Sequence, residues 1–202
     1  WTVFDASILP TNAVPAWTQG DVGNPPATFR IINSFKPGNK VLYETTNASG
    51  DRMTYKLSGT KPMNGTWVFR TKAGTKESSM EFEFNVLAKG ILNPAQDTGK
   101  RINIKLYPYK KGGYIKLNYV DFNGVYPSDS SLDVTSWHVY RITVQDGRYF
   151  KIYVDENPQP VITCSAGNSG VQNHILRFGD IGNTFTEGYL DWMAWDFLGA
   201  YA

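Results

Sequence analysis

Apolar and polar residues alternate along several short segments of the chain. Between Met80 and Val86 every second residue is apolar, and the positions between them hold Glu81, Glu83 and Asn85. A period of two places the two sets on opposite faces of a β-strand. The pattern therefore predicts strands that have one buried face and one polar face. The segments that share it are 67–72, 80–86, 102–107 and 114–119.

Turn-forming residues separate these segments along the whole chain, which is typical of antiparallel β-proteins. Asp146-Gly147 lies between the β-branched and aromatic runs 137–144 and 148–154, and it predicts a tight hairpin. Residues 190–198 also fit a helical period, but they are rich in aromatic residues and follow a turn-like Gly188. We interpret them as a terminal strand. The expected fold class is all-β, an antiparallel sandwich of two sheets.

Composition narrows the class of protein further. The 202 residues are 41% hydrophobic and 14% aromatic, which excludes a disordered chain and predicts one domain over residues 1–202. Only 19% are charged and the net charge is +2, so we expect no nucleic-acid partner. No apolar run is long enough to predict a membrane span. The single cysteine, Cys164, excludes an intramolecular disulfide and a cysteine-based zinc cluster.

The C-terminal third of the chain resembles a known superfamily. Trp137-His138 opens one strand, the returning strand of the hairpin reads Tyr153-Val154-Asp155, and Gly188 precedes an aromatic-Asp-aromatic strand. This series is similar to laminin-G-like domains of the concanavalin A-like lectin/glucanase superfamily. The resemblance implies a jelly roll of one concave and one convex sheet, with sugars bound across the concave face.

The resemblance also implies a ligand-binding face formed by the polar sides of consecutive strands. It implies, in addition, a structural calcium ion between the first and last strands, where Asp5 and Asp196 stand. The hairpin residue His138 would lie on the convex sheet, away from the ligand. The expected ligand-binding residues are Arg70, Glu81, Glu83, Asn85, Lys105, Tyr107, Tyr114 and Lys116.

Glu81 and Glu83 are the most enzyme-like feature of this face. Carboxylates two residues apart on one strand lie roughly 6–7 Å from each other, near the separation that glycoside hydrolysis uses. The related glucanases carry a longer row of acidic residues, of which only part is present here. The alternative is a ladder in which Arg70, Lys105 and Lys116 neutralise the glutamates.

Two further residue types bear on the chemistry. A polysaccharide lyase needs a base whose pKa is shifted by a neighbouring cation, and for these roles the chain offers Tyr114 near Lys116. His174 is instead expected in a loop or at a sheet edge. Sugar rings stack on exposed aromatic side chains. Trp67 alternates with Phe69 and is expected in the core, and Trp17 lies in a loop near prolines and is the better exposed platform.

The sequence therefore predicts a secreted or extracellular carbohydrate-binding module whose partner is a polysaccharide. Two N-glycosylation motifs, at Asn47 and Asn64, are compatible with secretion. Lysine and arginine on the predicted face favour an acidic or mixed glycan. An enzyme on the same fold, a lyase or a glycosidase, is the alternative. A third possibility is an adhesion or structural domain in which the charged face binds no sugar.

Overall fold

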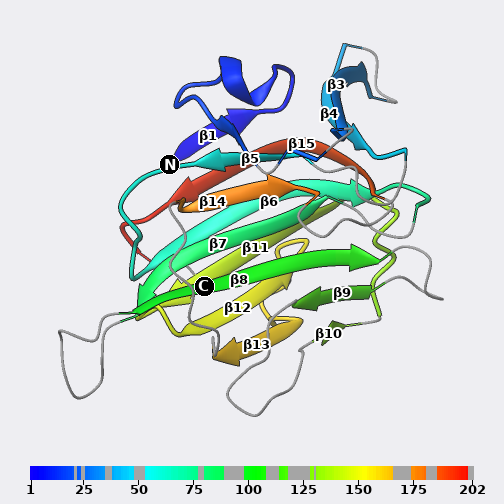
Figure 1. The fold of residues 1–202 in the computed structure, drawn as a ribbon. Helices are drawn as coiled ribbons and strands as arrows, with labels where there is room; N and C mark the ends of the chain where they lie inside the picture. The colour runs from blue at the N-terminus through cyan, green and yellow to red at the C-terminus, as the bar shows by residue number, and fades with distance from the viewer. Residues whose placement is uncertain are drawn as a thin grey trace.

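The computed structural model describes residues 1–20, 22–23, 26–34, 38–47, 53–76, 80–88, 98–107, 114–117, 128–129, 131–165, 174–180 and 186–199. These residues form two antiparallel sheets that lie face to face, with β8 of one sheet crossing in front of β11 and β12 of the other (Figure 1). The predicted all-β jelly-roll sandwich is confirmed. No helix in the described ranges is long and apolar enough to span a membrane.

The larger sheet, here sheet A, has eight strands. In spatial order it contains β13 (Ile162–Ser165), β12 (Tyr149–Val154), β11 (His138–Gln145), β6 (Gly65–Ala73), β15 (Glu187–Asp196), β4 (Lys40–Thr45) and β3 (Thr28–Asn33). Strand β1 (Thr2–Asp5) also pairs with β15.

The second sheet, sheet B, has seven strands. Their order is β10 (Ser128–Asp129), β9 (Tyr114–Leu117), β8 (Thr98–Tyr107), β7 (Glu81–Ala88), β14 (Leu176–Gly179), β5 (Thr54–Leu57) and β2 (Thr18–Gly20). A short 3-10 turn, η1 (Pro10–Asn12), precedes β2.

The local predictions about strands and turns hold in the structure. Strands β11 and β12 form the expected hairpin, and its turn contains Asp146 and Gly147 with φ values of 54° and 62°. Positive φ at both positions is what a tight hairpin turn requires. Residues 187–196 form strand β15, as we interpreted them, with an irregularity in the register between Leu190 and Trp192.

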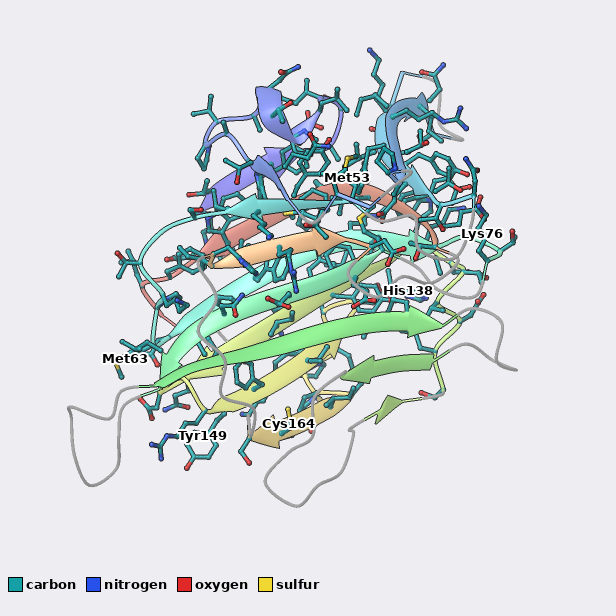
Figure 2. The ribbon with its side chains drawn as sticks, viewed as in Figure 1. Met53, Met63, Lys76, His138, Tyr149 and Cys164 are labelled. Carbon is teal, nitrogen blue, oxygen red and sulfur yellow. The ribbon has the colours of Figure 1, made fainter. Side chains whose placement is uncertain are left out.

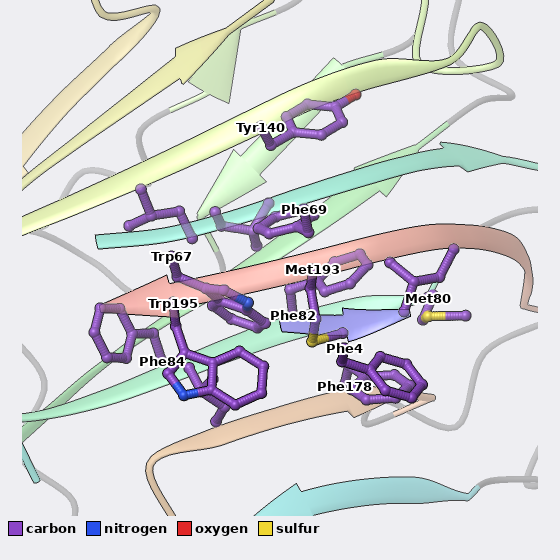
Figure 3. Close-up of a cluster of buried hydrophobic side chains, with 14 of the residues drawn as sticks. Phe4, Trp67, Phe69, Met80, Phe82, Phe84, Tyr140, Phe178, Met193 and Trp195 are labelled. Atoms are coloured by element: carbon purple, nitrogen blue, oxygen red, sulfur yellow. The ribbon is translucent and has the colours of Figure 1, made fainter. Parts of the chain in front are cut away.

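The core lies between the sheets and consists largely of aromatic side chains (Figure 3). Trp67 and Phe69 of β6 are fully buried, as the alternation predicted. Phe69 stacks on Phe82 of β7, with ring centroids 4.1 Å apart, so the contact joins sheet A to sheet B. Burial of such large side chains is the main contribution to the stability of the sandwich.

The expectation that Trp17 is an exposed sugar platform is wrong. Its side chain is 1% exposed and packs edge-on against Phe178 and Trp195, with centroids 5.1 and 5.6 Å away. Nearby prolines indicate an irregular segment, but they do not indicate which way its side chains point. Here the indole points into the core between Phe178 and Trp195, where its removal from water is favourable.

Candidate functional site

The predicted ligand-binding residues are divided between the two sheets. Arg70 lies on β6 of sheet A, whereas Glu81, Glu83 and Asn85 lie on β7 of sheet B. Both strands turn their apolar residues toward the same core, so their polar residues point outward in opposite directions. The expectation that Arg70 shares one surface with the glutamates is therefore wrong, and the same holds for the predicted ion-pair ladder between them.

The remaining predicted positions belong to neighbouring strands of sheet B. The backbone register pairs Lys105 with Lys116 and Tyr107 with Tyr114, across β8 and β9. Strand β8 in turn pairs with β7. The structure thus brings the β7, β8 and β9 positions of the predicted site together. Their role in ligand binding stays a prediction.

Glu83 is the centre of a buried polar network on the outward face of sheet B. His174 Nε2 lies 2.7 Å from Glu83 Oε1, and the Asn85 side-chain amide donates to the same oxygen at 3.0 Å. Arg177 Nη2 donates to Oε2 at 2.5 Å. Arg177 reaches this position because β14 pairs with β7 in a register that places it opposite Glu83. Both carboxylate oxygens of Glu83 are therefore occupied.

These contacts hold Glu83 in its ionised form. Burial by itself would raise the pKa of the carboxyl group, since it disfavours the charged state. The hydrogen bond from His174, the positive charge of Arg177 and the amide of Asn85 outweigh burial and lower the pKa to about 2. Glu83 is thus suited to accept hydrogen bonds, and it is unsuited to act as a general acid near neutral pH.

Nothing in the sequence identifies Arg177 or His174 as partners of Glu83. His174 was expected in a loop or at an edge, and it directly precedes β14 but is 2% exposed. The charged Arg177 between Leu176 and Phe178 is the only local signal, because alternation places it on the polar face. The pairing of β14 with β7 could not be deduced from that alternation.

A pair of buried acidic residues, Glu44 and Asp180, lies at the end of β4. The backbone N–H of Asp180 donates to Glu44 Oε1 at 2.6 Å, and both residues are fully buried. Burial, the negative charge of Asp180 and the more distant charge of Glu81 raise the pKa of Glu44 well above its usual value, against the opposing effect of this hydrogen bond. No local pattern in the sequence marks this pair, which links β4 of sheet A to the end of β14 in sheet B.

The register does not favour one ion held by both Asp5 and Asp196. Asp5 pairs with Trp192, so Asp196 lies four residues farther along β15, about 13 Å away by the strand rise. Each carboxylate caps its own turn, through the N–H groups of Ser7 and Leu198. No group of three or more potential metal ligands occurs among the residues that the structure describes. The calcium ion expected between the first and last strands stays a prediction.

Arg70 and His138 have partners on sheet A. Arg70 forms an ion pair with Asp191 of β15 and lies over the ring of Trp137, 4.7 Å from its centroid. His138 Nδ1 lies 2.6 Å from Asp155 Oδ2, which ties β11 to the turn after β12. The expected position of His138 on the sheet opposite the glutamates is confirmed by the topology.

No family model matches the chain, and no curated protein matches it. Among solved structures, a native glycosidic hydrolase is 15% identical with a TM-score of 0.55, covering 99% of this chain and 97% of that one. A second structure is 14% identical, with a TM-score of 0.53 and 98% coverage of both chains. Its description concerns endo-acting O-glycanases that members of the human gut microbiota express to initiate mucin breakdown. A Bacillus subtilis protein of unknown function with a galectin-like fold is 9% identical, with a TM-score of 0.51, covering 97% of this chain and 98% of that one.

At these identities the similarity concerns the fold. It extends over nearly the full length of each chain, and it agrees with the two-sheet topology and with the residues that first indicated the resemblance. The chain therefore has a two-sheet antiparallel jelly-roll fold, which it shares with these structures.

Proposed function

We propose that this chain is a carbohydrate-binding domain that holds a polysaccharide on the outward face of sheet B, at the network around Glu83. Two of the structures that share its fold are described as a glycosidic hydrolase and an O-glycanase. A secreted or extracellular location, where a protein meets polysaccharides, is part of the same proposal.

The observation that carries the proposal is a prearranged set of polar groups on an outward sheet face. Asn85 is fully buried, its amide nitrogen is held by Glu83, and its Oδ1 accepts no hydrogen bond within the described part of the chain. A buried acceptor without a donor is unfavourable. Oδ1 is itself buried, so a ligand must displace what covers it before a hydroxyl can donate to Oδ1 and remove that cost.

The protonation state of Glu83 favours binding over acid catalysis at this position. Glycoside hydrolysis needs one carboxyl group that keeps its proton until it protonates the leaving oxygen. Glu83 has its pKa lowered to about 2 and both oxygens occupied, so it serves as a fixed acceptor.

The test is retention of the protein on a panel of neutral and acidic polysaccharides. Hydrogen bonds to sugar hydroxyls contribute little net free energy, and we expect dissociation constants on the order of 10 μM to 1 mM. Asn85→Ala should weaken binding by roughly tenfold, the value of one hydrogen bond. Asn12→Ala, at the exposed last position of η1, is the control and should leave binding unchanged. Equal affinities for the two variants would contradict the proposal.

A second comparison probes the strands beside β7. Lys116→Ala on β9 should weaken binding of acidic polysaccharides, and Lys151→Ala on β12 of the opposite sheet should not. Melting curves of all variants distinguish a lost contact from a lost fold. If no polysaccharide is retained, the chain is a structural or adhesion domain.

A polysaccharide lyase is the second candidate, and one observation favours it. Glu83 holds the ring of His174 through Nε2 at 2.7 Å, and Arg177 lies in the same network. A base fixed beside a cation suits removal of the proton next to a uronate carboxylate, after which the glycosidic C–O bond breaks and a C=C bond forms. The test is absorbance of the unsaturated product on polygalacturonate. Steady turnover that His174→Gln abolishes would establish this candidate instead.

A further inference from the structure

A row of aromatic and cationic side chains crosses the outward face of sheet A, opposite to the sheet that carries Glu83. The register pairs Arg30 of β3 with Tyr43 of β4, Tyr43 with Tyr189 of β15, and Tyr189 with Lys72 of β6. Trp137, directly before β11, completes the row. The next residue, His138, pairs with Thr71, which directly precedes Lys72 on β6. We call these five residues the sheet A row; its strands neighbour one another in Figure 1.

Consecutive members of the row contact each other. The guanidinium of Arg30 lies 5.0 Å from the centroid of the Tyr43 ring, and the Tyr43 and Tyr189 rings are 5.0 Å apart. Lys72 Nζ lies between two rings, 4.7 Å from the centroid of Tyr189 and 5.7 Å from that of Trp137. The row is therefore one continuous surface of three aromatic rings and two cations, in which Lys72 lies between Tyr189 and Trp137.

The surface is accessible and has an excess of positive charge. Arg30 is exposed, and Lys72, Trp137 and Tyr189 are half-buried, whereas Tyr43 is mostly covered. The two carboxylates next to the row already accept other groups: Glu187 accepts the Tyr43 hydroxyl at 2.9 Å and the Thr75 N–H at 2.7 Å.

Asp191 accepts Arg70 and the side-chain amide of Asn39. The three cations Arg30, Arg70 and Lys72 thus outnumber the carboxylates of Glu187 and Asp191 by one. Partial burial lowers the pKa of Lys72, against the charge of Glu187. An anion placed beside its ammonium group would favour the charged form and offset this burial.

These groups match one kind of ligand. Aromatic rings stack on the apolar faces of sugars, and cations pair with carboxylates or sulfates. Neighbouring strands are about 4.8 Å apart, so the row presents a new group at intervals close to the length of one sugar ring. We propose that the sheet A row is a second glycan site, which binds an extended anionic polysaccharide along the row, across the strands of sheet A.

The test measures dissociation constants with polygalacturonate, dextran sulfate and neutral dextran, followed by intrinsic tryptophan fluorescence. Lys72→Ala should weaken binding of an anionic chain by about tenfold, since it removes a partly desolvated cation at the centre of the row. The better of the two anionic probes identifies carboxylate or sulfate as the preferred group.

Lys151→Ala is the matched control on the same sheet. Lys151 is exposed and pairs with Thr143 and Thr163 in sheet A. Tyr149, on the same strand, lies at the end of the sandwich opposite to Lys76 (Figure 2). Equal losses in Lys72→Ala and Lys151→Ala would mean non-specific attraction between charges and would overturn the proposal. The aromatic contribution is checked with Tyr189→Phe, which should keep the affinity within about twofold, and Tyr189→Leu, which should reduce it, with melting temperatures recorded for both.

The two proposed sites are distinguishable because their variants lie on opposite sheets. Loss of binding in Asn85→Ala with full binding in Lys72→Ala supports the site on sheet B and overturns the one on sheet A. The reverse pattern supports the sheet A row and overturns the site around Glu83.

Discussion

Two fully buried glutamates of this chain lie in opposite electrostatic environments. Glu83 contacts the cation Arg177 and the ring of His174, and its pKa is lowered to about 2. Glu44 lies against a second carboxylate, that of Asp180, and its pKa is raised. Near neutral pH the first is an ionised acceptor, whereas the second holds its proton more strongly than an ordinary glutamate does. Equal burial therefore accompanies pKa shifts in opposite directions because the neighbouring charges differ.

Glu83→Gln should destabilise the fold, since it leaves Arg177 buried without its anion. We expect the free energy of unfolding in urea at pH 7 to fall by about 3 kcal/mol. A folded pKa of about 2, below the ordinary 4.5, stabilises the native state at every pH above 4.5. This contribution is lost as pH falls from about 4.5 to about 2, so the wild type and the variant should converge there.

The matched control for this change is Glu156→Gln. The Glu156 side chain is 65% exposed and lies 3.5 Å from Arg141 Nε. Its removal should alter the free energy of unfolding by less than about 0.5 kcal/mol. Equal effects of the two substitutions would contradict a specific role of the network around Glu83.

Glu44→Gln should have the opposite effect. A raised pKa in the folded state means that the native protein loses stability as pH rises above the ordinary value of 4.5. Glutamine carries no charge and can still accept the Asp180 N–H. In urea unfolding at pH 5, 6, 7 and 8, the variant should match the wild type at the lowest pH and exceed it increasingly as pH rises. A deficit that is the same at all four pH values would contradict the raised pKa of Glu44.

At the scale of the elements, close approach between strands depends on a few backbone positions. Gly179 ends β14 with φ of 120°, and a Cβ there would lie 2.4 Å from the carbonyl oxygen of Met53 and 3.0 Å from Thr54 Cα. Both are backbone atoms of the neighbouring segment, so a change of side-chain rotamer cannot relieve the clash. Because β14 also carries Arg177, the same glycine helps to hold the network around Glu83 in place.

Gly179→Ala should therefore be far more damaging than the same change at Gly38. Gly38 also has a positive φ, 82°, but within the described part of the chain nothing lies within 4 Å of its added Cβ. We expect a cost of about 1 kcal/mol at Gly38 from the backbone conformation alone. At Gly179 we expect more than about 3 kcal/mol, because the clash is added. Thermal unfolding of both variants checks this, and similar melting temperatures would contradict it.

At the scale of the whole molecule, one aromatic core joins both sheets and the N-terminal segment. Phe4 of β1 and Trp17 lie 6.1 Å apart between ring centroids, and Trp17 contacts Phe178 of sheet B and Trp195 of sheet A. The indole therefore touches residues of both layers, and its removal should weaken the entire sandwich.

Trp17→Ala should lower the free energy of unfolding by about 3–5 kcal/mol, the usual cost of removing a large buried aromatic side chain. Trp1→Ala is the control, since Trp1 is 62% exposed, and it should change the value by less than about 0.5 kcal/mol. Far-ultraviolet circular dichroism in increasing urea follows the fold without depending on the substituted tryptophan. Equal midpoints for the two variants would contradict the position of Trp17 in the core.

What the sequence by itself determined is local. The alternation around Phe82 and Phe84 defines strand β7 and its buried face, and Asp146-Gly147 defines the hairpin, because both depend only on residues near in the chain. The tertiary structure decided which strands meet. It placed β6 and β7 in different sheets, which separates Arg70 from Glu83, and it brought Arg177 to Glu83 from 94 residues away. Strand pairing depends on how all the apolar faces share one core, and no single strand carries that information.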